Sequence, residues 1–461
     1  MGLFDLACRR VIQPLWARRE SARAARLARE LDRRQFDPPG IVRARQLAAL
    51  RRMLHYASVT VPFYRQRFAA IGFTPERLRS LDDFAALPML TKSDIRAQAE
   101  ALLSTSFHRS ALTRKSTSGS TGVPLVVYLD RAGLEWKRAA TVRSDEWSGW
   151  RRGQRAAKVW GNPEFQHHGW RGRLRNWLYE RAIYLDTLRM TPETIDRFAH
   201  ALARTKPDLI FGHAHSLYLL ADHIRRGGLP VCRPRGIIAT AMVLHDWQRR
   251  RIESVFGCAV TNRYGCEEVS LIACECSEHR GMHVNADSVL VEIVRDGRPA
   301  APGESGSIVV TDLSNFAMPL IRYQVGDVGA LTERMCPCGR GLPLLERLEG
   351  READYVVTAA GELISGISLT ENFAVLVPGV AQIQIVQETV DRFLFRIVRD
   401  SGFNAASERT LAELVAERFG PTAEFRTEFV AAIPPEPSGK YRFCISHVAR
   451  PGREEERRAA A

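Results

Sequence analysis

The sequence of 461 residues has no uninterrupted apolar run near the roughly 20 residues that a helix needs to span a bilayer. Its first residues, MGLFDLACRR, also lack an apolar stretch followed by a small-residue cleavage site, the pattern of a secretion signal. These two absences argue against a membrane-spanning or exported protein, and we expect a cytoplasmic location. The apolar content of 45% is that of a globular chain, and the length predicts more than one folding unit.

A disulfide framework is not expected either, although the sequence contains nine cysteines. Four of them form the close pairs Cys274/Cys276 and Cys336/Cys338. In a large chain expected in a reducing compartment, such pairs favour metal binding over disulfides.

Three thiolates and an imidazole from these segments would suit a closed tetrahedral Zn²⁺ site. We expect the ligands to be Cys276, His283, Cys336 and Cys338, with Cys274 or His279 as an alternative for one of them. Gly339 would let the backbone turn tightly around the metal. Four protein ligands leave no open position, so we expect a structural zinc. Reduced thiols without metal and a redox pair are the alternatives.

The net charge of +14 calls for an explanation, because it could indicate an anionic partner. Residues 1–55 carry thirteen arginines against five acidic residues, interleaved with apolar residues at helical spacing. One interpretation is a helix packed on the main body with a solvated arginine face. A second is an interfacial helix, residues 15–34, that associates weakly with an anionic membrane. No recognition-module signature accompanies the charge, so we expect no nucleic-acid partner.

Residues 155–345 alternate short β-rich runs with amphipathic helices, which predicts parallel α/β layers. The expected strands include AAKVW, DLIFG, GIIAT and AVTNRYG, and the expected helices include PETIDRFAHALA, SLYLLADHIRR and HDWQRRRIESVF. Residues 289–312 follow a strand, turn, strand pattern and predict a smaller antiparallel β unit. Residues 56–110 predict short helices, one of them starting at Thr91 or Ser93.

The predicted organisation has two domains. A basic helical lead, residues 1–55, belongs to a large N-terminal α/β domain that continues over residues 56–349. Residues 350–450 form a small C-terminal α+β domain with its own strands, AQIQIVQE and FLFRIV, and a helix, SERTLAELVAERF. Residues 451–461 are expected to be disordered.

The most specific element is the loop STSGSTGVP, residues 116–124. Its glycines allow a ligand to approach the backbone closely, and its N–H groups and hydroxyls can hold phosphate oxygens. The loop lacks the GK[ST] ending of a Walker loop, which excludes the usual P-loop NTPase interpretation. A Ser/Gly loop taken alone is equally compatible with an ordinary turn or linker.

Four further motifs follow this loop, and together they resemble a known family. They are YGCEEV (264–269), RYQVGD (322–327), GREAD (350–354) and PSGKYR (437–442). The five resemble, in order, the phosphate-binding, Tyr-Gly-x-x-Glu, ribose-binding, hinge and catalytic-lysine motifs of the adenylate-forming superfamily, which includes acyl-CoA synthetases, luciferases and peptide-synthetase adenylation domains. PFYRQRF, AMPLIRY, MHVNADSVLVEIV and CPCGRGLPLLE resemble its phenylacetate:CoA ligase branch, and the last is similar to members associated with capsule and exopolysaccharide synthesis.

The resemblance implies an adenylate-forming N-terminal domain, a mobile C-terminal lid domain and a two-step ligase that uses ATP, Mg²⁺ and CoA. Lys440 is expected to bridge the carboxylate and the α-phosphate, Thr121 to assist catalysis and Glu268 to hold Mg²⁺. The residues expected to contact the nucleotide are Ser118, Gly119, Ser120, Thr121, Gly122, Ala241, Tyr264, Gly265, Asp327 and Arg351.

Three positions depart from the family pattern. Leu125 stands where a lysine often follows the phosphate loop, Glu267 replaces a common Thr or Ser, and Ala353 occupies the place of a hinge aspartate. The first two concern phosphate contacts, and the third concerns the rotation of the C-terminal domain. These departures motivate a rival interpretation, a non-catalytic scaffold in polysaccharide biosynthesis. The presence of Lys440 with the other motif residues argues against it.

The partners implied are a small carboxylic acid, ATP and CoA, with an amine, a sugar or a carrier protein as alternative acceptors. We expect the acid pocket near Phe211, His213, His215 and Tyr218, with Trp160 and Phe165 as walls. Aromatic residues of an ordinary core would give the same sequence pattern. The sequence leaves open both the identity of the acid and the oligomeric state.

Overall fold

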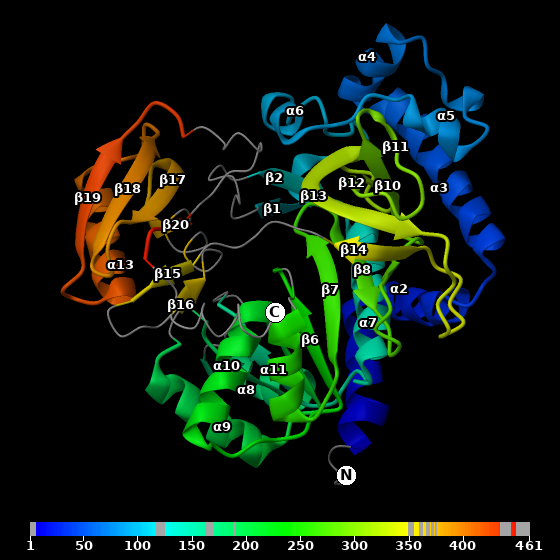
Figure 1. Cartoon of the computed structure of the whole chain (residues 1–461). Helices are drawn as coiled ribbons and strands as arrows, with labels where there is room; N and C mark the ends of the chain where they lie inside the picture. Colours follow the sequence, from blue (N-terminus) through cyan, green and yellow to red (C-terminus); the bar gives the residue numbers. More distant parts are fainter. Residues whose placement is uncertain are drawn as a thin grey trace.

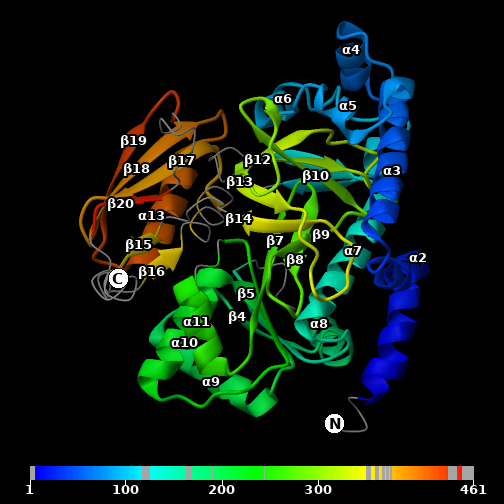
Figure 2. The same ribbon diagram turned by 45° about the vertical axis from the view of Figure 1, so that its right-hand side comes forward.

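The computed structural model describes residues 6–116, 125–161, 169–187, 190–242, 244, 246–348, 355–358, 363–365, 369, 373, 376–433 and 444–448. Figures 1 and 2 show a large part made of helices around a long sheet, with a smaller sheet beside it. Among the described residues, none of the helices combines the length and the apolar character needed to cross a bilayer.

A 12-stranded sheet runs through the large part, and one half of it is parallel. The parallel strands, in spatial order, are β4 (Ala182–Leu185), β3 (Ala156–Val159), β5 (Leu209–His213), β6 (Gly236–Thr240) and β7 (Val260–Cys266). The crossover helices are α9 (Pro192–Thr205), α10 (Ala214–Gly227) and α11 (Asp246–Phe256). They pack on one face through Phe198, Leu217 and Phe256. The strands and helices predicted here are confirmed, and so are the parallel layers up to β7. The predicted parallel range, which extended to residue 345, is too long, because the strands from β8 onward pair in antiparallel fashion.

Beyond β7 the sheet is antiparallel. The strands that follow in space are β8 (Ser270–Glu275), β9 (Met282–Val284), β14 (Leu344–Leu348), β13 (Tyr323–Thr332), β12 (Gly306–Asp312), β10 (Val289–Arg295) and β11 (Arg298–Pro299). The predicted pairing of residues 289–312 is confirmed, since β10 and β12 are antiparallel neighbours. They do not form a separate unit, however, because β13, β14, β9 and β8 connect them to β7 in one sheet.

Short helices precede the sheet in sequence and cover its antiparallel half (Figure 1). They are α3 (Pro39–Thr60), α4 (Pro62–Ala70), η2 (Pro75–Arg77), α5 (Leu81–Ala85), α6 (Lys92–Ala97) and η3 (Arg109–Ala111). Thr91 caps α6, since its side chain accepts a hydrogen bond from Asp94 N and Asp94 bonds back to Thr91 N. The first of the two predicted helix starts is therefore confirmed.

The arginine-rich lead forms π-helix η1 (Cys8–Ile12) and α2 (Gln13–Arg34). Ser21 interrupts α2 with a non-helical backbone, and its hydroxyl oxygen accepts a hydrogen bond from Ala24 N. Beyond this kink, the buried Leu27 and Leu31 pack on α7 (Arg131–Asp145). The apolar side of residues 22–34 is therefore covered by protein, as the packed-helix interpretation requires.

The C-terminal part has its own core. Its strands are β15 (Tyr355–Val357), β16 (Leu363–Ser365), β17 (Val380–Gln387), β18 (Arg392–Arg399), β19 (Glu424–Phe429) and β20 (Cys444–Ser446), with helix α13 (Ala405–Phe419). Phe373, Phe393, Phe395 and Phe419 stack at the centre of this core. The two strands and the helix predicted here are confirmed. The expected boundary at residue 350 and the tail 451–461 lie outside the described residues.

A buried ion pair ties α7 to the sheet. Lys137 Nζ lies 2.6 Å from Asp312 Oδ2, and the two side chains are 5% and 0% exposed. The same ammonium group donates to the carbonyl oxygen of Val269, 2.8 Å away, at the turn between β7 and β8. Lys137 thus fixes the chain immediately after Glu268.

We expect Lys137→Met to lower the free energy of unfolding by about 3 to 5 kcal/mol, because the substitution leaves the carboxylate of Asp312 charged in the core. Urea unfolding followed by tryptophan fluorescence measures this change. The control is Arg392→Met, which removes an exposed pair with Glu424 and should cost less than about 1 kcal/mol. A loss below about 1 kcal/mol for Lys137→Met would contradict the role assigned to the buried pair.

Candidate active site

Tyr264 and Asp327 come from distant motifs and meet in the structure. The hydroxyl group of Tyr264 on β7 donates a hydrogen bond of 2.9 Å to Asp327 Oδ2 on β13. A bulge in β13 brings Asp327 into position: Gln324 and Val328 pair with Val309 and Ser307, which are two residues apart, so β13 carries extra residues here. Gly326 adopts the left-handed conformation, with φ +94°, within this bulge.

Glu268 lies in the turn between β7 and β8 and is 6% exposed. Tyr323 Oη donates a hydrogen bond of 2.8 Å to Glu268 Oε1. Arg96, on α6, lies near Glu268. Burial lowers the pKa of Arg96, and the negative charge of Glu268 partly opposes this lowering. Neither Tyr323 nor Arg96 is among the site residues predicted from the sequence. The only signal for Tyr323 was its place in the RYQVGD motif, and Arg96 had no signal that set it apart from many other arginines.

Cys266 lies near both acidic residues, Glu268 and Asp327. Burial raises the pKa of its thiol well above its usual range, and the negative charges of Glu268 and Asp327 raise it further. The thiol of Cys266 therefore stays protonated at neutral pH. The influence of Glu268 and Asp327 on the same thiol also shows that the two carboxylates lie at the same edge of the sheet. A concentration of carboxylate oxygens is the donor type that Mg²⁺ prefers, so this end of the sheet fits such an ion.

The strands that flank the predicted phosphate loop lie near this edge. β1 (Thr113–Ser116) and β2 (Val126–Leu129) pair as antiparallel strands, with Ser116 opposite Val126. Lys115, just before the loop, lies 3.4 Å from the carboxylate of Glu267. The base of the loop is thus beside the YGCEEV motif, although Ser118, Gly119, Ser120, Thr121 and Gly122 lie outside the described residues.

Ala241 and Gly265 lie at the carboxyl ends of β6 and β7. Ala241 has a positive φ of +66°, which turns the chain away directly after β6. Thr240 Oγ1 donates a hydrogen bond of 2.9 Å to the carbonyl oxygen of Arg263 and holds the two strand ends together. Gly265 lies at a register shift between β7 and β8, where the chains approach closely. Ligands of parallel α/β sheets bind at this carboxyl edge.

Two further predicted residues, Lys440 and Arg351, lie outside the described part of the chain, as do Ala353 and Phe165. The described members of the predicted set, Ala241, Tyr264, Gly265, Glu268 and Asp327, are gathered by β6, β7 and the bulge of β13.

A cavity of about 320 Å³ lies against β3 and β5, on the face opposite α10. Its lining residues are Gln13, Asp145, Trp150, Arg152, Gly153, Gln154, Ala156, Lys158, Trp160, Tyr179, Glu180, Leu209, Phe211 and Arg263. The expectation for Trp160 and Phe211 agrees with this lining, whereas His215 and Tyr218 lie on α10 and do not line the cavity. His213 is fully buried against the ring of Trp160, with 4.0 Å between the ring centroids.

Charged groups are paired or shifted toward neutrality in this cavity. Arg263 forms an ion pair of 2.7 Å with Asp145 and lies over the ring of Phe211. Burial raises the pKa of Asp145 and lowers the pKa of Lys158. Burial also lowers the pKa of His213 to about 4, so its imidazole is neutral at physiological pH. The cavity therefore offers aromatic rings together with several polar groups.

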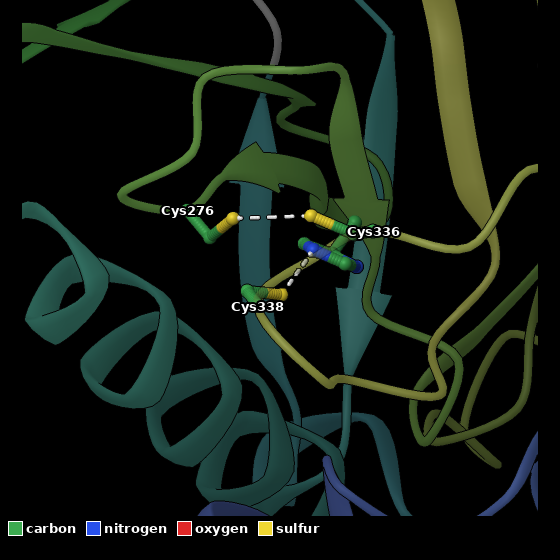
Figure 3. Close-up of side chains that lie close together, drawn as sticks. Cys276, Cys336 and Cys338 are labelled. Carbon is green, nitrogen blue, oxygen red and sulfur yellow. Dashed lines mark hydrogen bonds between the residues drawn. The ribbon is translucent and has the colours of Figure 1, made fainter.

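The predicted metal ligands form a compact cluster. The ligand atoms of Cys276, His283, Cys336 and Cys338 all lie within 4.8 Å of one another. Cys276 Sγ is 3.7 Å from Cys336 Sγ, and Cys338 Sγ is 3.2 Å from His283 Nε2. Figure 3 shows the three sulfur atoms turned toward a common centre. Burial lowers the pKa of His283 to about 4, so the imidazole is neutral and suited to metal binding.

The two alternative ligands lie outside this cluster. The thiol of Cys274 contacts the carbonyl oxygen of Ser144, and the imidazole of His279 lies 3.1 Å from the carboxylate of Glu275. Gly339 has φ +79°, and its N–H donates to the carbonyl oxygen of Cys336, which closes the tight turn expected around the ligands.

The ligand turn also holds the end of α2. Gln35 Oε1 accepts hydrogen bonds from Trp147 and from Arg340, the second residue after Cys338. The carbonyl oxygen of Gln35 accepts a third from Gly341 N. The cluster is therefore built into the contact between the N-terminal helices and the sheet, and it lies apart from the carboxyl edge.

Comparison with known protein families and curated proteins gives two kinds of match. Residues 356–447 match the CapK C-terminal domain family. Over 326 residues, the chain is 28% identical to the phenylacetate-coenzyme A ligase of Thermus thermophilus, with 68% of this chain and 72% of that protein covered. Over 372 residues it is 25% identical to Protein CapK of Staphylococcus aureus, with 78% and 80% covered.

Solved structures give the same result for the fold. A crystal structure of 2-hydroxyisobutyryl-CoA ligase in complex with 2-HIB-AMP and CoA aligns with a TM-score of 0.60 and 23% identity, over 93% of this chain and 94% of that chain. A second structure of the same ligase, in an open conformation, has a TM-score of 0.57. The fold class and the resemblance to the adenylate-forming superfamily and its phenylacetate:CoA ligase branch are confirmed.

We expect Gly265→Ala to lower the free energy of unfolding by at least about 2 kcal/mol, because an added Cβ would lie 2.5 Å from the carbonyl oxygen of Ser270. The control is Gly40→Ala in α3, where no atom lies within 4 Å of the added Cβ. Chemical unfolding of both variants measures the difference. Equal stability of the two variants would show that β7 and β8 can separate without cost at this position.

Proposed function

We propose that the protein activates a carboxylic acid with ATP, through an acyl-adenylate, and transfers the acyl group to the thiol of CoA. The observation that carries this proposal is the meeting of Tyr264, Asp327 and Glu268 at the carboxyl edge of the sheet, beside the base of the phosphate-loop hairpin. The similarity to phenylacetate-coenzyme A ligases over more than two thirds of the chain supports the same reaction class.

In the proposed reaction, each residue at the edge has a separate task. The carboxylate of Asp327, oriented by Tyr264, accepts hydrogen bonds from the ribose hydroxyls. The ring of Tyr264 and the chain at Ala241 lie along the adenine. Glu268, oriented by Tyr323, holds Mg²⁺. A bound Mg²⁺ supplies positive charge to the phosphates.

Lys440 has the central role in the first step. Attack of a carboxylate on the α-phosphate brings two anions together, so the transition state needs a positive charge where they meet. We assign this charge to Lys440 and further hydrogen bonds to the phosphate loop, including Thr121. Arg351 adds a ribose or phosphate contact. The C-terminal domain then rotates, as in the family that the motifs resemble, and the acceptor thiol takes the acyl group.

The cavity beside Trp160 and Phe211 is our candidate for the acid's side chain. Its lining includes Arg263 of β7, the strand whose carboxyl end carries Tyr264, so the proposed acid site and the proposed nucleotide site share this strand. The mixture of aromatic rings with Lys158, Glu180 and Arg152 favours an acid that carries polar groups over a purely aliphatic one.

The setting that we propose is polysaccharide biosynthesis. The CPCGRGLPLLE segment resembles relatives associated with capsule synthesis, and residues 356–447 match the CapK C-terminal domain family.

The compact Cys/His cluster supports a structural zinc, since three thiolates and one imidazole fill a tetrahedral shell.

The test of the function is ATP–pyrophosphate exchange over a panel of aryl, fatty and sugar acids. We expect the wild type to exchange pyrophosphate with at least one acid and Lys440→Ala to lose on the order of 10²-fold or more in rate, because the lysine acts chiefly in the transition state. The second half-reaction, started from preformed acyl-adenylate, should change much less. Arg392→Ala, an exposed residue of the C-terminal part, serves as the control with an unchanged rate.

Two results would count against these assignments. An active wild type whose Lys440→Ala variant exchanges at the same rate would remove the role of this lysine. A folded wild type that binds ATP but exchanges with no acid of the panel would favour the scaffold interpretation.

We expect about one Zn²⁺ per chain in freshly purified protein, bound by the cluster of three cysteines and one histidine. Cys336→Ser with Cys338→Ser should remove the metal and lower the melting temperature, while ATP affinity changes little, because the cluster lies apart from the carboxyl edge. Cys258→Ser, outside the cluster, is the control. Metal analysis by plasma mass spectrometry that finds no zinc in the wild type would refute the site.

A further inference from the structure

Exposed apolar side chains gather on two adjoining helical segments. Trp170 and Leu174 lie in α8 (Gly169–Arg175) and Trp177 lies in η6 (Asn176–Glu180), while Val11 and Leu15 lie in η1 and α2. Trp170 is 67% exposed, Trp177 59% and Leu15 58%. η1 packs against η6, so the two segments are neighbours. We call these five side chains with their helices the tryptophan surface.

Helical spacing puts the apolar residues of each segment on one side. Trp170, Leu174 and Trp177 follow the i, i+4, i+7 pattern along the continuous helical run 169–180, and Val11 and Leu15 are four residues apart. An amphipathic helix in a soluble protein normally turns such a side inward. Here it faces solvent, and the two tryptophans are the most exposed of the large apolar side chains on these segments.

Basic residues are frequent in the same two segments of the sequence. Residues 6–20 carry four arginines and one acidic residue, and residues 169–181 carry four arginines and one acidic residue, which gives a net charge of +6. Arg171, Arg173 and Arg175 are exposed, and the guanidinium of Arg171 lies over the ring of Trp170 at 5.4 Å. Trp and Arg together on one exposed helix are typical of the interface between water and an anionic bilayer.

Contacts between the first part of α2 and η6 support the tryptophan surface. The ring of Trp16 stacks on Tyr179 with centroids 5.2 Å apart, and Gln13 donates a hydrogen bond to the carbonyl oxygen of Tyr179. The kink at Ser21 separates this first part of α2 from the second part, which is packed on α7. The surface is therefore a supported face of the folded protein, and its apolar side chains need not leave a core to become available.

We propose that the tryptophan surface docks onto a bilayer that contains anionic phospholipid. The tryptophans and Leu15 enter the interfacial region, and the arginines of the same segments meet the headgroup phosphates. The proposal narrows the expected segment, residues 15–34, to the first part of α2, because Leu27 and Leu31 are buried against α7.

A second copy of the chain is a poorer occupant. In a two-fold dimer the same surface would face itself and bring two sets of like charges together, which opposes association. An anionic bilayer instead supplies negative charge around an apolar interior, which complements both features of the surface.

The test is vesicle flotation of the full chain, with vesicles of phosphatidylcholine alone and of phosphatidylcholine mixed with phosphatidylglycerol. We expect binding to the mixed vesicles only, weakened by added salt. Trp170→Ser with Trp177→Ser should reduce partitioning by at least about tenfold, and Arg171→Glu with Arg173→Glu should abolish the preference for anionic vesicles. Val59→Ser with Ile71→Ser, two exposed apolar residues elsewhere, is the matched control and should bind like the wild type.

Melting temperatures of all variants check folding, and they should match the wild type because the changed side chains are exposed. The proposal would be overturned if the double tryptophan variant bound the mixed vesicles as well as the wild type does. It would also be overturned if the wild type bound neutral and mixed vesicles equally well. Sedimentation velocity adds a third decisive outcome. A wild-type dimer that the tryptophan substitutions dissociate, with no vesicle binding, would assign the surface to a second copy.

Discussion

The pairing of β7 with two unlike neighbours is the constraint on which the rest of the structure depends. One edge of β7 takes β6 in parallel, and the other takes β8 in antiparallel pairing. β7 is therefore the strand at which the parallel part of the sheet meets the antiparallel part. Tyr264, near the carboxyl end of β7, is thereby brought to Asp327 of the β13 bulge. Gly265 is needed at this junction because any side chain would meet the carbonyl oxygen of Ser270.

The groups at this junction are fixed by hydrogen bonds from neighbouring side chains. Tyr323 orients Glu268, Tyr264 orients Asp327, and Lys137 of α7 holds the carbonyl oxygen of Val269. Each of these contacts uses a buried or nearly buried group, so its loss would leave an unpaired polar atom away from water. Arg96 lies near Glu268, and Lys115 pairs with Glu267, so positive groups accompany the acidic ones at this junction.

The Cys/His cluster and the cavity link the site to the N-terminal helices in different ways. The cluster, through Arg340 and Gly341, holds the end of α2 at Gln35. The beginning of α2 contributes Gln13 to the cavity wall, together with Tyr179 and Glu180 of η6. The outer side of these same segments is the tryptophan surface. A partner bound to that surface would therefore lie directly across the cavity wall from the proposed acid site.

The sequence alone determined the features that depend on local order along the chain. The alternation of residues 155–345 predicted β3, β5, β6, β7 and their helices, and the spacing of five motifs indicated the superfamily. The Cys/His spacing predicted the four cluster residues, with Cys274 or His279 as an alternative for one of them. Tertiary structure decided the rest, because strand pairing and side-chain contacts join residues far apart in sequence. The expected parallel layers and the expected antiparallel β unit form one continuous sheet. Of the candidate metal ligands, Cys276 and His283 lie in the cluster, and Cys274 and His279 do not. Tertiary structure also brought Tyr323 to Glu268, and it left Trp170 and Trp177 exposed where amphipathic spacing would normally predict burial.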